Sequence, residues 1–461
     1  MSREKDSDRH DATGPGEEGF GQQRREFLRA LGGAIGVAIV ADAATIGDVA
    51  EGARRRRSAL PSGYVWHPVL REGQGGLGPG EKILPGVLIN DRSEVIFHTH
   101  RQQEESGEGP RAVYRMRIGR GPKPGARRPA PIVRSGDTLH DGVVVSRIGA
   151  GDTNDSGAYV TTIQAQRGLS GVYIQRPGHG LRRLVGPSDR IPGPRGRYSG
   201  HFGDIDLESN GDILVVATYT LPGEAQQGLF LLPGGRRKGG RVLLRTGHRI
   251  PDSRALVTRL GLVERHGGWF IQQVFGRQRK HRARGDLKTE PSGFLAGRVS
   301  RGRKGARLLV GAKPLKPARS VVDGEAFVGP RIDRSGVAAT VTHKSPSHLT
   351  LHRHSGGRAD RIARSGNRTR RGFRAETISA PVFGPGGLLY YRAISKRTME
   401  LLVVAGNERR MILETGDRVG GRKVRALNLG WHTDQIDSRG RLAFQVEYFD
   451  GSTGIVIGTP V

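Results

Sequence analysis

The stretch "ESNGDILV" (208–215) places a tight turn, Asn210-Gly211, directly before an apolar run. Six other stretches have the same order: "NDRSEVIF" (90–97), "NDSGAYVT" (154–161), "ERHGGWFI" (264–271), "DRSGVAAT" (333–340), "GPGGLLYY" (384–391) and "DSRGRLAF" (437–444). The fourth position is glycine in every copy except 90–97, where it is Ser93. Because glycine adopts positive φ without steric cost, the repeat predicts a turn with positive φ at this position.

The apolar run in each turn stretch is followed by a second run, as in "GLFLLP" (228–233), and in six of the seven copies by a third run, as in "LLRTGHRI" (243–250). The third run is missing from the last copy, which ends at "TGIVIGTPV" (453–461), and an extra one, "PVLREGQ" (68–74), precedes the first copy. A closed ring would use that N-terminal run to complete the last unit and would leave no open sheet edge. We therefore predict an all-β protein, a closed β-propeller of seven four-stranded blades, with Ile213–Val216 as an inner strand. Two β-sandwiches are the alternative, but they require neither a fixed repeat nor a displaced strand.

The turn stretches also resemble a tandem-repeat family written N-x-x-G-x-x-A-F. The matching residues are Asn90, Ile96 and Phe97 in the first copy, Asn154 and Gly157 in the second, and Gly440, Ala443 and Phe444 in the last. The resemblance covers most of 64–461. It implies a propeller-like fold on an exported protein, and it implies no activity.

The N-terminal stretch "QRREFLRALGGAIGVAIVADAATIG" (23–47) resembles a twin-arginine export signal, with Arg24 and Arg25 before Phe27 and Leu28. Gln23 stands where Ser or Thr is usual, and Ala41 and Ala43 flank Asp42 as a small-x-small cleavage site. The apolar run 30–40 is shorter than the roughly 20 residues of a spanning helix. The resemblance implies export through the twin-arginine translocation machinery, to the periplasm, cell surface or medium of a prokaryote. We expect a signal segment (1–43), a basic linker (44–63) and a propeller domain (64–461) without a membrane span.

The composition is strongly basic and lacks cysteine. Lys and Arg number 75 against 44 Asp and Glu, for a net charge of +31, and such a surface attracts polyanions. The arginines are spread from end to end, so a compositional bias explains them equally well. Three basic stretches, 276–288, 300–309 and 366–374, would form an anion-binding surface if several shared one face of the propeller; otherwise they are solvated loops.

"GRGPKPGARRPAP" (119–131) lacks the ending of a phosphate-binding loop and is predicted to be a plain loop. The absence of cysteine excludes disulfides and thiolate chemistry.

Two patterns have metal-like spacing. "DTNDSG" (152–157) and "DIDLESNG" (204–211) alternate oxygen-bearing side chains as calcium loops do, but Ile163 stands where the twelve-residue loop needs Glu. Turn chemistry explains the same residues, so we expect no cofactor and keep calcium only as an alternative. His98 with His100, and His352 with His354, each share one face of a strand. We expect these pairs at exposed strand positions rather than in a zinc site.

No nucleophile elbow, metalloprotease motif or phosphate-binding loop is present, so no catalytic, cofactor-binding or metal-binding residue is assigned. The function expected is therefore a monomeric, exported, non-enzymatic propeller that binds an anionic cell-envelope ligand or a protein partner. The alternative is an exported hydrolase or lyase with its site at the central channel. Carboxylates or three histidines converging at the channel mouth would favour the enzyme.

Overall fold

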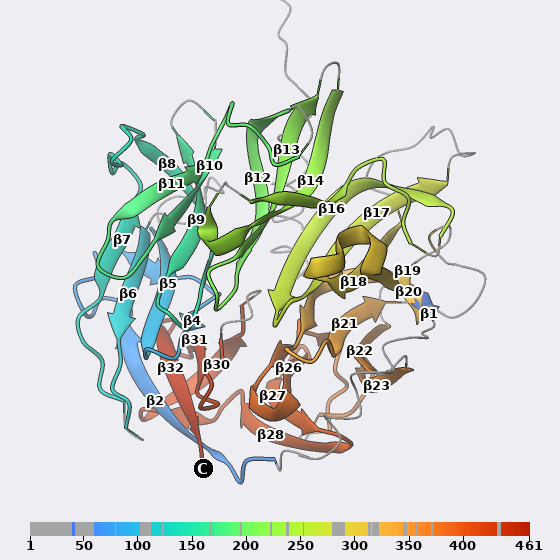
Figure 1. Cartoon of the computed structure of the whole chain (residues 1–461). Helices are drawn as coiled ribbons and strands as arrows, with labels where there is room; N and C mark the ends of the chain where they lie inside the picture. The colour runs from blue at the N-terminus through green and yellow to red at the C-terminus, as the bar shows by residue number, and fades with distance from the viewer. Residues whose placement is uncertain are drawn as a thin grey trace, which may run out of the picture. The chain divides into compact units, whose positions relative to one another are not determined.

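The computed structural model describes residues 39–41, 60–78, 80–101, 112–121, 124–165, 168, 170–193, 196–221, 224–236, 239–251, 253–278, 291–311, 315, 322–343, 348–355, 358–369, 372–430 and 435–461. All of the strands lie in one compact unit, residues 36–461. Its seven blades, each of antiparallel strands, follow one another around a ring, which confirms the predicted β-propeller (Figure 1).

Each blade is ordered from an innermost strand at the axis to an outermost strand at the rim. Blade 1 has β3 (Glu81–Ile83) with β4 (Leu88–Ile89), then β5 (Glu94–Arg101), β6 (Ala112–Arg117) and β7 (Ala130–Arg134). Blade 2 has β8 (Val145–Thr153), β9 (Tyr159–Ala165), β10 (Ser170–Gln175) and β11 (Leu181–Val185). Blade 3 has β12 (Arg197–Leu207), β13 (Ile213–Leu221), β14 (Glu224–Leu232) and β15 (Arg241–Arg245).

Blade 4 has β16 (Ala255–His266), β17 (Trp269–Gln278), β18 (Ser292–Arg298) and β19 (Ala306–Gly311), and blade 5 has β20 (Val322–Ile332), β21 (Ala338–His343), β22 (Leu349–Ser355) and β23 (Arg358–Arg364). Blade 6 has β24 (Thr377–Ile378) with β25 (Val382–Phe383), then β26 (Leu389–Ile394), β27 (Met399–Ala405) and β28 (Glu408–Glu414). Blade 7 has β30 (Arg422–Asn428), which also pairs with β29 (Arg418–Val419), then β31 (Leu442–Tyr448), β32 (Thr453–Pro460) and β2 (Tyr64–Arg71).

Short elements connect some of these strands. The 3₁₀ turns are η1 (Pro233–Gly235), η3 (Val299–Gly305) and η4 (Pro385–Gly387). One parallel bridge, between Val310 and Val322, joins the sheets of blades 4 and 5. The backbone of β1 (Ile39–Ala41) pairs antiparallel with β20. No helix among the described residues is long and apolar enough to cross a membrane.

The expectation that Ile213–Val216 is an inner strand is wrong in its position within the blade. These residues begin β13, the second strand, whereas the innermost strand is β12, which precedes the turn. The inner edge is recognised because β12 contacts β8 and β16, the corresponding strands of the two neighbouring blades. The repeated turn therefore joins the first strand of each blade to the second, close to the axis of the ring.

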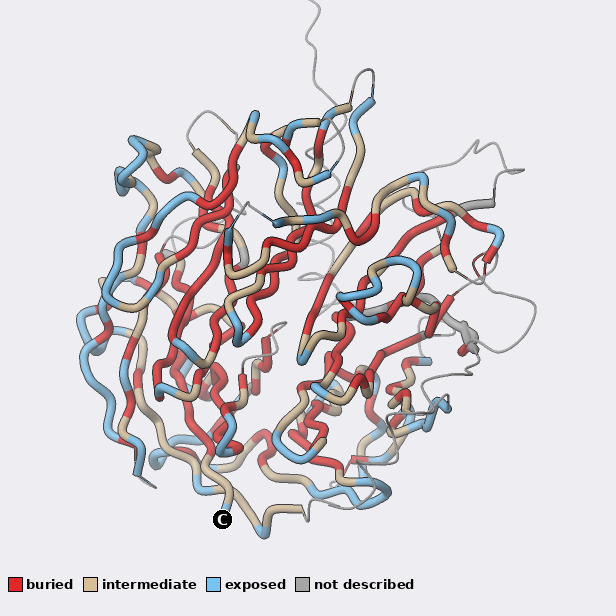
Figure 2. Tube along the Cα trace, in the orientation of Figure 1, coloured by how far each residue is buried: buried red, intermediate tan, exposed pale blue. Residues whose placement is uncertain are grey.

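The second strands have continuous apolar runs because both of their faces are covered. In β13, Leu214 and Val216 pack toward blade 4, while Ile213 and Val215 pack toward blade 2. All four side chains are at most 1% exposed. A strand buried on both faces has no polar face, so the usual alternation is lost. Figure 2 shows this burial following the strands, with the exposed residues concentrated in their connections.

The ring closes as predicted, with the N-terminal strand completing the last blade. β2 pairs with β32 from Tyr64–Pro460 to Arg71–Gly454. The indole ring of Trp66 packs edge-to-face on Phe444, with ring centroids 5.5 Å apart, and its N–H donates to the Ile412 carbonyl. Strand pairing and side-chain packing thus tie the two ends of the propeller together, and this closure removes the sheet edge that β32 would otherwise expose.

Candidate functional site: the turn face of the propeller

The seven repeated turns lie at one end of the blades, together with the connections between the third and fourth strands. We call this end the turn face. In four turns an Asn or Asp begins the motif and its side chain accepts backbone N–H groups of the same turn. Asn90 Oδ1 accepts from residues 92 and 94, Asp333 Oδ1 from 335 and 337, and Asp437 Oδ1 from 439 and 441, all at 2.8–3.1 Å. Asn154 Oδ1 accepts from the Ala158 N–H at 3.0 Å. The first residue of the motif therefore caps its own turn.

The fourth position has positive φ in all seven copies, with values from 57° to 84°, so the prediction from glycine is confirmed. Ser93 adopts the same conformation, with φ 62°. Its hydroxyl accepts from Arg441 Nη2 at 2.8 Å. Arg441, which is 2% exposed, also pairs with Asp437 at 2.6 Å. A hydroxyl is thus placed where blade 7 meets blade 1 and offsets the strain of a non-glycine residue at positive φ.

Contacts between turns hold neighbouring blades in register on this face. Asn154 Nδ2 donates to the Glu208 carbonyl at 3.0 Å, and Ser209 Oγ donates to Asp155 Oδ2 at 2.8 Å. Arg92 Nη1 donates to the Ser156 carbonyl at 3.0 Å. Each of these bonds joins blades that follow one another in the ring.

One ion pair joins blades that are not neighbours. Arg334 of blade 5 pairs with Asp155 of blade 2, with Nη2 and Oδ2 3.3 Å apart. Arg334 Nε also donates to His266 Nε2 of blade 4 at 3.0 Å. We call Asp155, Arg334 and His266 the axial bridge, because they join turns from blades 2, 4 and 5. The Arg334 side chain is 64% exposed and that of Asp155 is 39% exposed, so water reaches the pair.

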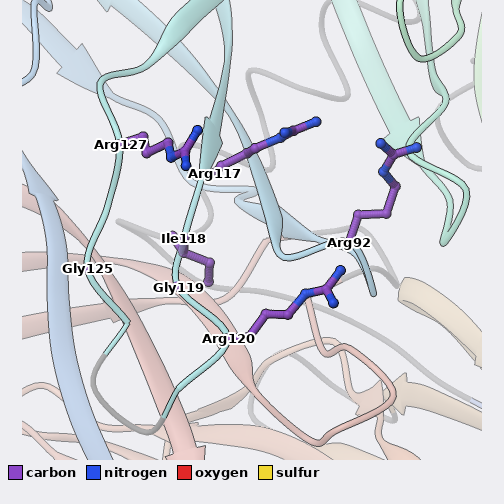
Figure 3. A pocket seen from close by; sticks show the side chains of 7 residues that line it. All are labelled: Arg92, Arg117, Ile118, Gly119, Arg120, Gly125 and Arg127. Atoms are coloured by element: carbon purple, nitrogen blue, oxygen red, sulfur yellow. The ribbon is translucent and has the colours of Figure 1, made fainter.

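A pocket of about 350 Å³ lies on the turn face of blade 1, and four arginines line it (Figure 3). We call it the arginine pocket; its lining residues are Arg92, Arg117, Ile118, Gly119, Arg120, Gly125 and Arg127. Arg92 comes from the blade 1 turn and Arg117 from the end of β6. The other lining residues belong to the connection between β6 and β7. Two connections of one blade thus bring four cationic side chains to one hollow.

The pocket has an excess of positive charge. The Glu94 carboxylate, 2% exposed, lies 3.5 Å from Arg117 Nε, 3.8 Å from Arg92 Nε and 3.9 Å from Arg115 Nη1. Burial lowers the pKa of Arg115, and Glu94 opposes that shift. Within the described part of the chain, neither Arg120 nor Arg127 has a carboxylate in ion-pair range. The pocket can therefore accept an anion from solution.

Carboxylates also converge at the axis, from the innermost strands. Asp152 Oδ2 accepts the Leu207 N–H at 2.7 Å, Asp206 Oδ2 accepts the Arg265 N–H at 2.9 Å, and Glu264 Oε1 accepts the Ile332 N–H at 3.1 Å. In each case the acid of one blade bonds the inner strand of the next. All three are at most 5% exposed.

The pKa values of two of these acids are shifted. Burial raises the pKa of Glu264 to about 7, with Arg331 opposing the shift. Burial, followed by the charges of Asp152 and Glu264, raises the pKa of Asp206. The acids are thus in electrostatic contact with one another, but each holds two blades together through the backbone.

The metal-like patterns of the sequence are part of this framework. Asp204 Oδ2 accepts the Val263 N–H at 2.9 Å, and Asp152, Asn154 and Asp206 make the bonds described above. Among the described residues, no three His, Asp or Glu side chains are arranged as ligands of one metal ion. The alternating acids thus connect blades.

The expectation that the paired histidines lie at exposed positions is wrong: one member of each pair is buried, and the other, His100 or His352, is only partly exposed. His98 and His354 are each 5% exposed. His98 Nε2 lies 3.0 Å from the Tyr159 hydroxyl, and His354 Nε2 lies 2.8 Å from Thr340 Oγ1. Burial, followed by His352, lowers the pKa of His354 to about 3. The structure therefore places both rings in buried hydrogen bonds rather than at a metal site open to solvent.

The residues predicted for export lie mostly outside the described residues: Arg24, Arg25, Phe27, Leu28 and Ala43. Ala41 is the last residue of β1.

The three basic stretches do not share one end of the blades. Residues 300–305 lie in η3, on the turn face, whereas 276–278 end β17 and 366–369 follow β23 at the opposite end. The arginine pocket escaped prediction because the pattern of 119–131 matches no phosphate-binding loop. The signal available was three arginines, at 120, 127 and 128, in a connection on the same face as Arg92.

No family model matches the chain, and no curated protein matches its sequence. Similar solved structures include a prolyl endopeptidase (11% identity, TM-score 0.47), a puromycin-hydrolyzing peptidase of Mycobacterium tuberculosis (11%, 0.46) and the polysaccharide lyase Uly1 (9%, 0.44). The matches cover 89%, 85% and 93% of this chain and 52%, 54% and 99% of those chains, respectively. The chain thus spans about half the length of the two peptidases. Likenesses this distant transfer no activity to it.

Proposed function

We propose that this chain is an exported, non-enzymatic β-propeller that binds an anionic ligand in the arginine pocket. The observation that supports the proposal is the set of four guanidinium groups around a hollow of about 350 Å³ with one buried carboxylate beneath it. Guanidinium groups present paired N–H donors that match carboxylates, sulfates and phosphates. The net charge of +31 adds a long-range attraction for such ligands.

The alternative, a hydrolase or lyase at the central channel, needs an acid or base within reach of a substrate. Asp152, Asp206 and Glu264 do converge, but they are buried and bonded to backbone N–H groups. The burial and backbone hydrogen bonds of these three acids therefore favour a binding function over a catalytic one.

Retention of the full chain on immobilised heparin tests the binding site. We expect retention at low salt and elution at moderate salt, because surface electrostatic attraction is screened. The double variant Arg120→Gln/Arg127→Gln should bind about tenfold more weakly, as expected for the loss of two charge-assisted contacts at a partly exposed site.

Arg358→Gln/Arg364→Gln is the matched control, because both arginines are exposed on β23, the outermost strand of blade 5. It makes the same change in net charge and should elute with the unaltered protein. Equal losses in the two double variants would show that net charge, and not the arginine pocket, governs binding.

The export proposal rests on the resemblance of residues 23–47 to a twin-arginine signal and on the N-x-x-G-x-x-A-F-like repeats. Secretion should stop when Arg24→Lys and Arg25→Lys are combined, because the translocation machinery would no longer recognise the pair. Arg3→Lys/Arg9→Lys makes two identical changes outside the motif and should be secreted normally. Unchanged secretion of the first variant would exclude this route.

A further inference from the structure

One residue of the arginine pocket and one of the axial bridge contact the same blade 2 turn. Arg92, in the pocket, donates to the Ser156 carbonyl, and Arg334 pairs with the adjacent Asp155. Neighbouring Cα atoms are about 3.8 Å apart, so the two guanidinium groups bind adjacent residues of the same blade 2 turn. Cationic groups from blades 1 and 5 thus lie along one short path over residues 154–157.

The Arg334 end of this path is open to exchange. Asp155 Oδ2 accepts from both Ser209 Oγ and Arg334 Nη2, so the carboxylate keeps a partner if Arg334 turns away. Because the pair is well exposed to water, it is held weakly. An anionic group from solution can therefore compete with Asp155 for Arg334.

We propose that the ligand is a linear carboxylated polysaccharide, bound with one acidic group in the arginine pocket and another at Arg334 in place of Asp155. This inference rests on the proposed function and specifies its ligand. A single small anion would use only the pocket. A chain with repeated carboxylates uses both positions and gains affinity, since the second contact is intramolecular.

The lining of the path favours a polysaccharide over a nucleic acid. Proteins that hold single strands stack their bases on aromatic side chains. No lining residue of the pocket is aromatic, and none of Asp155, Arg334 and His266 is Phe, Tyr or Trp. Phe449, an exposed aromatic residue, lies in the connection between β31 and β32, at the end of the blades opposite the turn face.

Calorimetric titration of the full chain at low salt, with galacturonate and with oligogalacturonates of two, four and eight units, tests the inference. Affinity should rise with length, by about tenfold or more once both positions are reached, and then level off. Arg334→Gln should abolish that rise and leave the affinity for galacturonate unchanged. Asp155→Asn should increase the affinity for the longer chains severalfold, because it removes the competing charge. Arg358→Gln is the control for a single lost charge.

The outcomes separate this inference from the proposed function. If galacturonate binds and Arg120→Gln/Arg127→Gln weakens it, but length has no effect, the inference fails and the pocket stands. If no galacturonate binds, the inference fails, and the proposed function fails with it when heparin does not retain the protein either. If oligothymidylate of equal charge binds more tightly than the oligogalacturonate, the choice of a polysaccharide is wrong. Because Arg334 and Asp155 are exposed, the variants are expected to fold, and an unchanged thermal midpoint verifies it.

Discussion

Two arginine–carboxylate pairs on the turn face belong to the same repeated motif but differ in their contact with water. Arg441 and Asp437, where blade 7 meets blade 1, are 2% and 0% exposed in their side chains, and their closest atoms are 2.6 Å apart. Arg334 and Asp155, at the axial bridge, are 64% and 39% exposed and 3.3 Å apart. The buried pair lacks water as an alternative partner, so its loss affects folding. The exposed pair exchanges its partners, so its loss affects binding.

The largest effect is expected from breaking the buried pair. Arg441→Met removes the partner of Asp437 and the shorter of two donors to Ser93 Oγ, and it leaves a carboxylate buried without its counter-charge. We expect the free energy of unfolding to fall by about 3–5 kcal/mol. Urea unfolding followed by tryptophan fluorescence measures it. Arg439→Met, which alters an exposed neighbour that also donates to Ser93 Oγ but does not pair with Asp437, is the control, and an equal loss there would show that the buried pair is not special.

A third ion pair, also buried, is expected to make the stability of the protein depend on pH. Glu264 and Arg331 are each 3% exposed in their side chains, with Oε2 and Nη1 2.6 Å apart. Because the folded pKa of Glu264, about 7, lies above its unfolded value near 4.5, the folded state binds the additional proton between these values. This group therefore lowers the stability as pH rises through that window, by about 3 kcal/mol at most.

Glu264→Gln should remove this contribution. The difference in unfolding free energy between variant and unaltered protein should then shift in favour of the variant as pH rises from 4.5 to 7. Buried His354 shifts stability with pH in the opposite direction, but it is present in both proteins and its effect cancels. Denaturant unfolding at pH 4.5, 5.5, 6.5 and 7.5 measures the difference. A constant difference would contradict the raised pKa.

A smaller effect is expected at Ser93, where the repeat departs from glycine. Ser93→Gly relieves a positive φ but loses the hydroxyl that accepts from Arg441, whereas Ser93→Ala keeps the strain and loses the hydrogen bond. Ser93→Ala should therefore be the more destabilising, by about 1 kcal/mol relative to Ser93→Gly. Unfolding midpoints of the two variants compare them directly. A less stable glycine variant would show that backbone strain is not significant at this position.

The sequence allowed the fold to be predicted because the propeller is specified locally and repeatedly. Turn glycines, doubly buried strands and the displaced run near 68–74 are all visible in one chain. The order of strands within a blade was predicted wrongly, because β12 and β13 are both apolar and only contacts with β8 and β16 identify the inner edge.

The candidate site could not be predicted in the same way. The arginine pocket joins residues 92 and 127, and the axial bridge joins Asp155 to Arg334, 179 positions away. Such pairs have no spacing signature. Residues 92 and 127 meet when blade 1 folds, and Asp155 meets Arg334 only when the ring has formed, so composition revealed the positive charge but not where it is concentrated.

The smallest effect on stability is expected from Arg334→Gln. Its guanidinium loses Asp155 and His266, but both pairings are exposed, and Asp155 retains Ser209 Oγ. We expect the unfolding free energy to change by less than about 1 kcal/mol, while the length dependence of oligogalacturonate binding disappears. Thermal unfolding and calorimetry on the same sample separate the two. A loss of stability comparable to that of Arg441→Met would mean that the axial bridge holds the ring together. The exposure of an ion pair would then not predict whether the fold depends on it. The distinction between the buried Arg441–Asp437 pair and the exposed Arg334–Asp155 pair would be wrong.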